Sequence, residues 1–326
     1  MIIDSTNKHL KVAHMGVAYL GPKASFSHQA ALAVFRDSTV KLEAVSSFAG
    51  IFDVVQSGKF EYGIVPFENS SNGSVMAVLD LLGDREAKHS DVRVCAEYYL
   101  PVQHQLLVKA PDSGALSLED SLKSIRKIYS HPQVWGQCSA FLSRPVCRSI
   151  ATQDCSSTSE AARLVSESEP GTTAAIASDL AATEFRLQTL VPNIEDRDDN
   201  TTRFFVLRKA GTYRLPPLPQ DGLETQNYKN LVLFTIDHEQ AGTLAEALSV
   251  FKRHNFNLTS INTRPSRLRP WHYIFFTECW QAYNEGGANA IRDMIADLDT
   301  VASSCRHVGA WKDQSNIAQG RAEQSD

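Results

Sequence analysis

Apolar segments typical of strands alternate with segments of helical periodicity over the first two thirds of the chain, and this alternation limits the possible folds. Three strand–helix pairs come first, at 17–20 with 28–35, 42–45 with 48–56, and 62–65 with 75–82. Strands joined by helices at this spacing form a sheet with parallel pairs. Further strands are expected at 92–98, 105–108, 127–129, 148–151, 174–177 and 203–207, with helices at 134–142 and 160–165. The expected fold class is α/β, and the strands at 92–98 and 105–108 could cross between two lobes.

Clusters of hydroxyl and amide side chains stand at the junctions between these elements. Examples are Ser25, the loop with Asn69 and Ser70, Thr158, and the pentapeptide Asn200-Thr201-Thr202-Arg203-Phe204. In open α/β sheets, ligands bind beyond the carboxyl ends of the strands, where helix N-termini present free N–H groups. The junctions therefore predict a neutral, donor-lined pocket for a small carboxylate. Ser25, Ser27 and Thr158 could equally be plain helix caps.

Several other classes of site are not supported by the sequence. It has no G-x-G-x-x-G between Gly21 and Gly73 and no G-x-x-x-x-G-K-[ST], so we expect no nucleotide cofactor. The six cysteines include no C-x-x-C pair, which argues against a zinc site and a disulfide framework. The acidic run at 195–199 is typical of a solvated loop, so no metal is expected. His131, which precedes Pro132, is expected to pack or form a turn rather than act as a base.

Charge and hydropathy exclude two classes of partner. The formal net charge of -5 argues against binding to nucleic acid or to an acidic membrane surface, since both need a large positive field. No stretch approaches the ~18 apolar residues of a membrane span. Residues 1–14 lack the apolar core of a signal peptide. We expect a cytoplasmic protein with neither a nucleic-acid nor a membrane partner.

The composition changes near residue 209 and indicates a second domain. The proline-rich segment around 215–219 is typical of a semi-rigid linker. Beyond it the pattern predicts a strand at 231–236, a helix at 242–253, strands at 258–263 and 271–279, a helix at 286–298 and a strand at 305–311. This βαββαβ order is ferredoxin-like. The expected organisation is a first domain at 1–208, a linker at 209–229, a second domain at 230–312 and a polar, disordered tail at 313–326.

Five motifs in the first ~208 residues, taken together and in order, resemble those of the prephenate dehydratase family. They are Leu20-Gly21-Pro22 with Ser25-Phe26-Ser27-His28-Gln29-Ala30-Ala31, Gly63-Ile64-Val65-Pro66-Phe67-Glu68-Asn69-Ser70 with Gly73 and Val75, Ser130-His131-Pro132-Gln133 with Gln137-Cys138, Ser157-Thr158 with Ala161-Ala162, and Asp196 followed by Asn200 and Thr202-Arg203-Phe204. The second domain resembles the ACT module that follows in that family. The run at 269–276 resembles fungal members.

The resemblance implies a two-lobed catalytic domain like that of periplasmic binding proteins, which converts prephenate to phenylpyruvate without a cofactor. By the same resemblance, Thr202 is the catalytic hydroxyl, a hydrogen-bond or proton donor to the departing hydroxyl of the substrate; chemistry alone would not separate it from Thr201. Donors to the substrate's carboxylates and keto group are implied at Ser25, Asn69, Ser70 and Thr158.

Two charged residues of these motifs have less certain roles. Arg203 suits a substrate carboxylate, although it could instead brace the loop against Glu195 or Asp196. Glu68 is included with the substrate-binding residues, but it could orient Asn69 instead, because a dianion would repel it.

For the second domain, the resemblance implies feedback inhibition by phenylalanine, bound at the interface of a homodimer or homotetramer. The matching loops are Gly242-Thr243-Leu244 and Asn262-Thr263-Arg264-Pro265. Thr243 stands where the family commonly has Ala, and Asn262-Thr263 where it has Glu-Ser, which leaves the effector response open. Ala24 stands where the family usually has Gly, and this change restricts the backbone of the first loop.

Two alternatives to this function remain. Arogenate, with an amine in place of the ketone, is a competing substrate. A non-catalytic amino-acid-binding regulator is the other alternative, because similar lobes occur in solute-binding proteins. The intact motif around Thr202 favours the enzyme, since a pure binder has no need of that hydroxyl.

Overall fold

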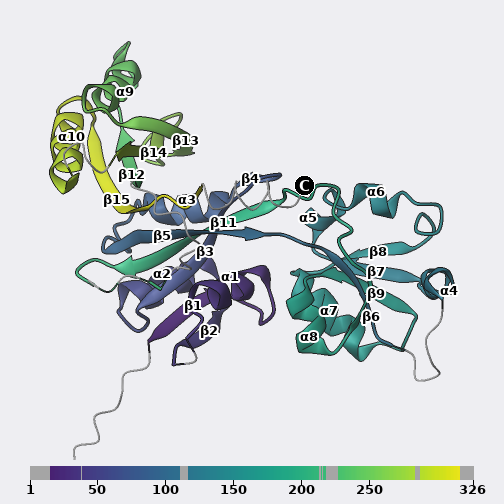
Figure 1. Cartoon of the computed structure of the whole chain (residues 1–326). Helices are drawn as coiled ribbons and strands as arrows, with labels where there is room; N and C mark the ends of the chain where they lie inside the picture. The colour runs from purple at the N-terminus through teal and green to yellow at the C-terminus, as the bar shows by residue number, and fades with distance from the viewer. Residues whose placement is uncertain are drawn as a thin grey trace, which may run out of the picture.

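The computed structural model describes residues 15–37, 39–110, 117–212, 214, 216–217, 227–282 and 287–315. It consists of two α/β lobes and a C-terminal βαββαβ domain, which lies against the first lobe (Figure 1). Residues 1–14, most of the expected linker and residues 316–326 of the expected tail lie outside the described residues.

The first lobe is built on five long strands in the order β2-β1-β3-β11-β5. Its strands are β1 (Gly16–Leu20), β2 (Lys41–Val45), β3 (Tyr62–Asn69), the short β4 (Gly73–Ser74), β5 (Val92–Pro101) and β11 (Thr201–Lys209), and its helices are α1 (Phe26–Val34), α2 (Phe48–Gln56) and α3 (Met76–Gly83). Strand β1 pairs in parallel with β2 and β3, whereas β11 pairs antiparallel with β3 and β5. Strand β3 is apolar at successive residues because Ile64 and Val65 enter core clusters on opposite faces of the sheet.

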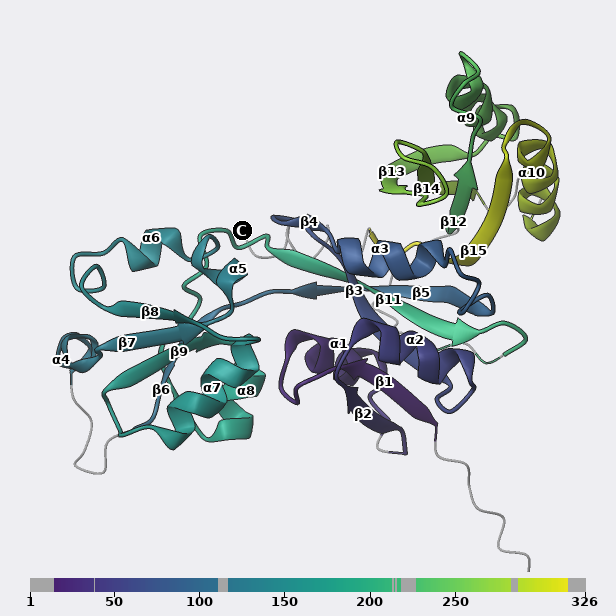
Figure 2. The same ribbon diagram turned by 180° about the vertical axis from the view of Figure 1, so that it is seen from behind.

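The second lobe has a five-stranded sheet in the order β10-β6-β9-β7-β8. Its strands are β6 (Gln105–Val108), β7 (Lys127–Ser130), β8 (Ala151–Asp154), β9 (Thr173–Ala177) and β10 (Gln188–Val191), and its helices are α4 (Leu118–Ser124), α5 (Pro132–Trp135), α6 (Ser139–Leu142), α7 (Thr158–Glu167) and α8 (Asp179–Phe185). The chain enters this lobe between β5 and β6 and returns between β10 and β11 (Figure 2). The predicted crossing between lobes is therefore confirmed, as is the α/β class.

The structure differs from the sequence-based prediction at several elements of the second lobe. The single helix expected at 134–142 is two short helices, α5 and α6, with Gly136 directly after the first. The strand expected at 148–151 is β8, which starts at Ala151 and is exposed along its whole length. An exposed edge strand carries no apolar run to mark its bounds. Helices α4 and α8 and strand β10 are short and were not expected.

The C-terminal domain has the predicted βαββαβ order. It comprises β12 (Asn227–Thr235), α9 (Thr243–Arg253), β13 (Asn257–Pro265), β14 (Tyr273–Ala282), α10 (Gly287–Val301) and β15 (Ser304–Lys312). The strand order is β13-β14-β12-β15, and α9 and α10 cover the face of this sheet that points away from the first lobe (Figure 1). Strand β12 begins three residues before the domain start expected from the sequence.

The C-terminal sheet joins the sheet of the first lobe edge to edge. Strand β15 meets β5 at the pair Gly309 and Val94, where a side chain on Gly309 would meet the Val94 backbone. Phe276 shares a core cluster with Leu79 of α3, and the Trp311 ring lies 5.1 Å from that of Phe205. The C-terminal domain is thus packed directly on the lobe that carries β3 and β11.

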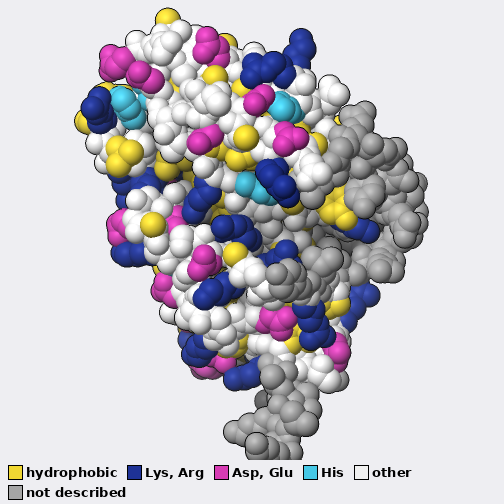
Figure 3. Space-filling view, turned by 90° about the vertical axis from the view of Figure 1, so that its left-hand side faces the viewer, with side chains coloured by type: hydrophobic (Ala, Val, Ile, Leu, Met, Phe, Trp, Pro, Cys, Tyr) yellow, Lys and Arg dark blue, Asp and Glu magenta, His cyan; other side chains and the backbone are white. Residues whose placement is uncertain are grey.

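The surface at the left-hand side of Figure 1 carries both signs of charge. Figure 3 shows the described Lys and Arg side chains on this face interspersed with Asp and Glu. Within the described residues, none of the helices has both the length and the apolar character needed to cross a membrane.

Candidate active site

A cavity of about 610 Å³ is lined by residues of both lobes. The first lobe contributes residues from 20–27, 69–76 and the start of β11, and the second lobe contributes residues from α5 and from the beginning of α7. Among the described residues that line it, none is Lys, Arg, Asp or Glu. The cavity therefore offers neutral hydrogen-bond donors and helix N-termini to a ligand, as the polar junctions in the sequence predict.

Thr202 and Asn69 form the central polar pair of this cavity. The Asn69 Nδ2 donates to Thr202 Oγ1 at 3.0 Å and to Asn200 Oδ1 at 2.9 Å. The Asn69 Oδ1 accepts from the backbone N–H groups of Ser71 and Asn72, both at 3.0 Å, which fixes the orientation of the amide. Because Thr202 Oγ1 accepts from Asn69, the Thr202 hydroxyl retains its own hydrogen for donation to a bound molecule.

The backbone of β11 determines which threonine reaches the cavity. Thr202 pairs across the sheet with Asn69 on β3 and Leu100 on β5. Thr202 and Phe204 line the cavity, as expected for alternate residues of one strand face. The Thr201 hydroxyl instead donates to Asp199 O at 3.1 Å. The geometry thus separates two neighbouring threonines that chemistry alone does not.

Ser25 and Thr158 line the cavity from opposite lobes. Ser25 is also the N-cap of α1, because its Oγ accepts from His28 N at 3.3 Å, and the same hydroxyl donates to Leu20 O at 3.0 Å. Thr158 is the first residue of α7, whose cap is Ser157. Capping uses only the oxygen of Ser25, so this hydroxyl can donate to a ligand if its hydrogen turns away from Leu20 O, whereas Thr158 is free of the capping role.

Ala24, which stands where the family usually has glycine, has an unusual backbone conformation. Ala24 has φ 63°, in the left-handed region, and its methyl group is buried. Its N–H donates to His28 Nδ1 at 3.0 Å. The alanine therefore keeps a backbone conformation that glycine would adopt more easily.

Three of the residues expected to bind substrate do not line the cavity, and Arg203 is the clearest of them. Its Nη1 and Nη2 donate to the two carboxylate oxygens of Glu278 at 2.7 and 2.6 Å, and Nη2 also donates to Glu68 at 2.9 Å. The Arg203 guanidinium lies on the opposite face of β11 from Thr202, outside the cavity, and is paired with these carboxylates.

Glu195 and Asp196, the alternative partners of Arg203, bond elsewhere, and the other two residues outside the cavity, Glu68 and Ser70, bond within the first lobe. Glu195 accepts from His104 N and Asp196 from the N–H groups of Ser139 and Ala140, so neither braces Arg203. Glu68 is the Arg203 partner just described. The Ser70 Oγ accepts from Thr201 N at 3.0 Å and so ties the loop after β3 to the start of β11.

A buried histidine and a glutamine complete the wall and were missed as site residues. The His104 Nε2 donates to Gln137 Oε1 at 2.7 Å. Burial lowers the pKa of His104, which keeps the imidazole neutral. Gln137 belongs to one of the sequence motifs and could have been proposed from it, whereas His104 has no pattern around it. His131 lines the cavity and caps α5, in keeping with the expected turn-forming role.

The chain matches the family model for prephenate dehydratase over residues 17–212 and the model for the ACT domain over residues 233–279. The chain belongs to the prephenate dehydratase family.

Relatives of this family match most of the chain. A probable prephenate dehydratase of Saccharomyces cerevisiae is 35% identical over 307 residues, which cover 82% of this chain and 88% of that protein. A bifunctional chorismate mutase/prephenate dehydratase of Aquifex aeolicus is 36% identical over 80% of this chain, which spans 64% of that protein's length. The prephenate dehydratase of Arthrobacter aurescens, solved in complex with L-Phe, has the same fold at a TM-score of 0.75 and 23% identity, over 95% of this chain and 98% of that one.

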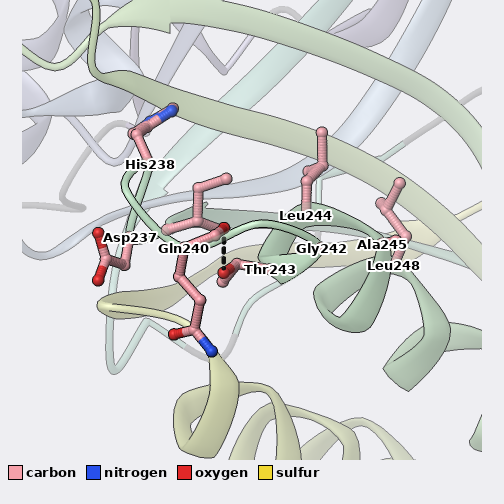
Figure 4. Close-up of a pocket in the computed structure, with 9 residues that line it drawn as sticks. Asp237, His238, Gln240, Gly242, Thr243, Leu244, Ala245 and Leu248 are labelled. Carbon is pink, nitrogen blue, oxygen red and sulfur yellow. Dashed lines mark hydrogen bonds between the residues drawn. The ribbon is translucent and has the colours of Figure 1, made fainter.

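The ACT domain has a second cavity, of about 430 Å³, beside the start of α9. Gly242, Thr243 and Leu244 line it, together with Asp237 and His238 (Figure 4). The Thr243 hydroxyl donates to Gln240 O at 2.9 Å, so it is satisfied within its own loop.

The other four residues of the expected effector site lie away from this cavity, on β13. Asn262 Oδ1 accepts from Ser74 Oγ at 2.9 Å, and Arg264 forms two hydrogen bonds to Asp80 at 2.9 and 2.8 Å. Thr263 and Pro265 lie on the same strand. Within one chain, only the residues at 242–244 line this cavity, whereas β13 packs against the first lobe.

Proposed function

We propose that this chain is a prephenate dehydratase, which converts prephenate to phenylpyruvate with loss of carbon dioxide and water. The observation that carries the proposal is the Thr202 hydroxyl in the neutral cavity, held by Asn69 with its hydrogen free to donate. Membership of the family supports the choice of reaction.

The residues at the cavity suit this reaction. The ring carboxylate of prephenate leaves as carbon dioxide, its bonding electrons enter the ring, and the C–O bond to the ring hydroxyl breaks. Aromatisation drives the step, so the protein must orient the substrate and help the hydroxyl to leave. Thr202 would donate to the departing oxygen, an effect of ~100- to 10,000-fold for a general acid. A free threonine is a weak acid, but the hydrogen bond from Asn69 stabilises negative charge that develops on Oγ1.

Substrate carboxylates would bind to neutral donors rather than to a cation. Ser25 and Thr158 face the cavity near the N-termini of α1 and α7, which favour an anion. The Gln137 amide, whose oxygen accepts from His104, has its nitrogen left for donation. The same arrangement would accept arogenate, whose carboxylates are identical.

The deciding experiment is product formation by the purified protein. With prephenate at neutral pH, we expect phenylpyruvate, a large loss of rate for Thr202→Ala, and a near-normal rate for Thr201→Ala, whose hydroxyl bonds to the backbone. Absence of product from the wild-type protein with both prephenate and arogenate would leave the non-catalytic amino-acid-binding regulator as the remaining function. A side-by-side rate comparison with arogenate identifies the preferred substrate.

We also propose that phenylalanine inhibits the enzyme at the ACT domain of a homodimer or homotetramer. The ACT match supports this proposal, and so does the separation of the residues at 242–244 from those at 262–265, which fits a site shared by two chains. We expect L-phenylalanine, and not D-phenylalanine, to lower the rate and raise the midpoint of thermal unfolding. Sedimentation with and without the ligand tests the assembly. Unchanged rate and midpoint with L-phenylalanine would remove the proposal.

A further inference from the structure

A cluster of buried charges joins the ACT domain to the first lobe. Its members, which we call the interdomain ion cluster, are Arg203 on β11, Glu97 on β5, Lys229 on β12, Glu278 on β14 and Asp313 after β15. Glu97 is 0% and Glu278 2% exposed. A buried charge lowers stability unless it is paired, so these ion pairs favour the arrangement of the two domains in which they form.

The contact between Arg203 and Glu278 has the most constrained geometry in the cluster. Both terminal nitrogens of the guanidinium bond to the two carboxylate oxygens, at 2.7 and 2.6 Å. The guanidinium carbon also lies 4.8 Å from the ring centre of Phe67 and 5.4 Å from that of Phe205. A two-point bond to a stacked guanidinium leaves Arg203 little freedom to move.

Arg203 is adjacent in the chain to the hydroxyl that we propose for catalysis. Two consecutive cross-strand pairs join β11 to β3 at this point, Thr202 with Asn69 and Arg203 with Glu68. Arg203 also bonds directly to the Glu68 carboxylate. The ladder is irregular between Arg203 and Phe204, so the side-chain bonds of Arg203 help fix the register where the regular pairing is interrupted.

The remaining contacts between the domains do not depend on Glu278. Lys229 bonds to Glu97, Arg264 bonds to Asp80, and apolar residues of both domains share one core cluster. Loss of the Glu278 charge should therefore leave the ACT domain docked, while Arg203 loses its two-point partner.

We propose that Glu278 is a positioning residue for the dehydration, which acts through Arg203 to hold Thr202 at hydrogen-bond distance from Asn69. The inference rests on the proposed function. It makes the rate of the catalytic domain depend on a carboxylate that only the docked ACT domain supplies.

The first test compares Glu278→Gln with the wild type on prephenate. A small misplacement of a catalytic group can lower the rate by about 100-fold, so we expect kcat to fall by about 10- to 100-fold, with KM within about threefold. Glu278→Asp keeps the charge on a shorter side chain and should recover part of the rate. Glu246→Gln, the same change on the exposed side of α9, should retain the wild-type kcat.

The second test places Glu278→Gln in the Thr202→Ala background. If Glu278 acts by positioning the Thr202 hydroxyl, it should cause no further loss of rate there, because the group it positions is absent. A purely structural role would lower the midpoint of thermal unfolding and would reduce the residual rate in either background.

The outcomes separate the two proposals. A wild-type protein without phenylpyruvate formation overturns the proposed function and this inference with it. An active wild type with an unchanged kcat in folded Glu278→Gln overturns only the inference, as does an equal loss in both backgrounds. If Glu278→Gln does not fold, Glu278→Asp decides: a folded variant with reduced kcat supports the inference, and one with wild-type kcat overturns it.

Discussion

The Asn69 side chain connects the loop after β3 to the Thr202 hydroxyl on β11, with 3.0 Å between Asn69 Nδ2 and Thr202 Oγ1. The same side chain accepts from Ser71 N and Asn72 N, which hold the loop that lines the cavity. One amide therefore sets both the shape of the loop and the polarity of the hydroxyl. The two halves of this side chain have different functions, and they can be separated by substitution.

Asn69→Asp is expected to remove the donor and keep the turn. The carboxylate can still accept from Ser71 N and Asn72 N, but its second oxygen would attract the hydrogen of the Thr202 hydroxyl. We expect kcat on prephenate to fall by about 100-fold, the size of effect seen when one donor to a developing charge is removed. KM should also rise, because the new charge repels a dianion.

Controls for this substitution are available in the same loop. Asn69→Ala removes the donor without adding charge, so it should lower kcat with a smaller effect on KM. Ser71→Ala leaves the backbone N–H in place and should behave as the wild type. A kcat for both Asn69 variants within threefold of the wild-type value would contradict the proposed role of the amide.

The order of strands and helices was largely predictable because the chain marks it locally. Apolar runs bounded by Gly, Pro or Ser located most strands, and the βαββαβ order of the C-terminal domain was predicted in full. The bounds of β8 and the short elements α4, α8 and β10 were not, since short or exposed elements carry little apolar periodicity. A helix cap can be recognised in the sequence only where a helix is already expected. Ser47 caps the expected helix α2, whereas Ser178 caps α8, which was not expected.

The site residues that belong to sequence motifs were predicted, whereas those whose role depends on tertiary contacts were not. The motifs led to Thr202, Asn69, Ser25 and Thr158, all of which line the cavity. The orientation of Arg203 depends on its partner Glu278, 75 residues away in another domain, and no local pattern encodes that contact. His104 is a single histidine whose importance depends on burial beside Gln137.

Ser25 and Ser47 form a matched pair for separating capping from binding. Each caps a helix of the first lobe, α1 or α2, but only Ser25 lines the cavity. We expect Ser25→Ala and Ser47→Ala each to lower the free energy of unfolding by about 1 kcal/mol. Only Ser25→Ala should also raise KM for prephenate, by about tenfold, the effect of one lost hydrogen bond to a charged group. Equal KM values for the two variants would show that Ser25 is a cap alone.

The hydrogen bond of Thr243 predicts a change in phenylalanine binding. Thr243→Val keeps the shape of the side chain but leaves Gln240 O without this donor, which loosens the loop that lines the ACT cavity. We expect the Kd for L-phenylalanine, measured by calorimetry, to rise about fivefold, as for the loss of about 1 kcal/mol. Thr300→Val is the control, because it removes a comparable bond from Oγ1 to Asp297 O on α10, and neither residue lines this cavity. An unchanged Kd for Thr243→Val would place the effector elsewhere.

The contact of Asp80 with Arg264 predicts a dependence of stability on pH. The Arg264 hydrogen bonds, with a further one from Arg85, lower the pKa of Asp80 from 3.8 to about 2. Because the pKa is lower in the folded state, the stabilisation is complete above the unfolded value near 4 and is lost as the pH falls through 2. The shift corresponds to about 2 kcal/mol.

Asp80→Asn is therefore expected to lower the free energy of unfolding by about 2 kcal/mol at pH 7, by about half as much at pH 3, and by little at pH 2. Denaturant titrations of both proteins at each pH measure this difference. Asp293→Asn, at an exposed position of α10, should change stability little at any pH. A difference between wild type and Asp80→Asn that stays constant from pH 7 to pH 3 would show that the Asp80 charge does not supply the stabilisation, and that Arg264 and Arg85 hold β13 against α3 by their other contacts.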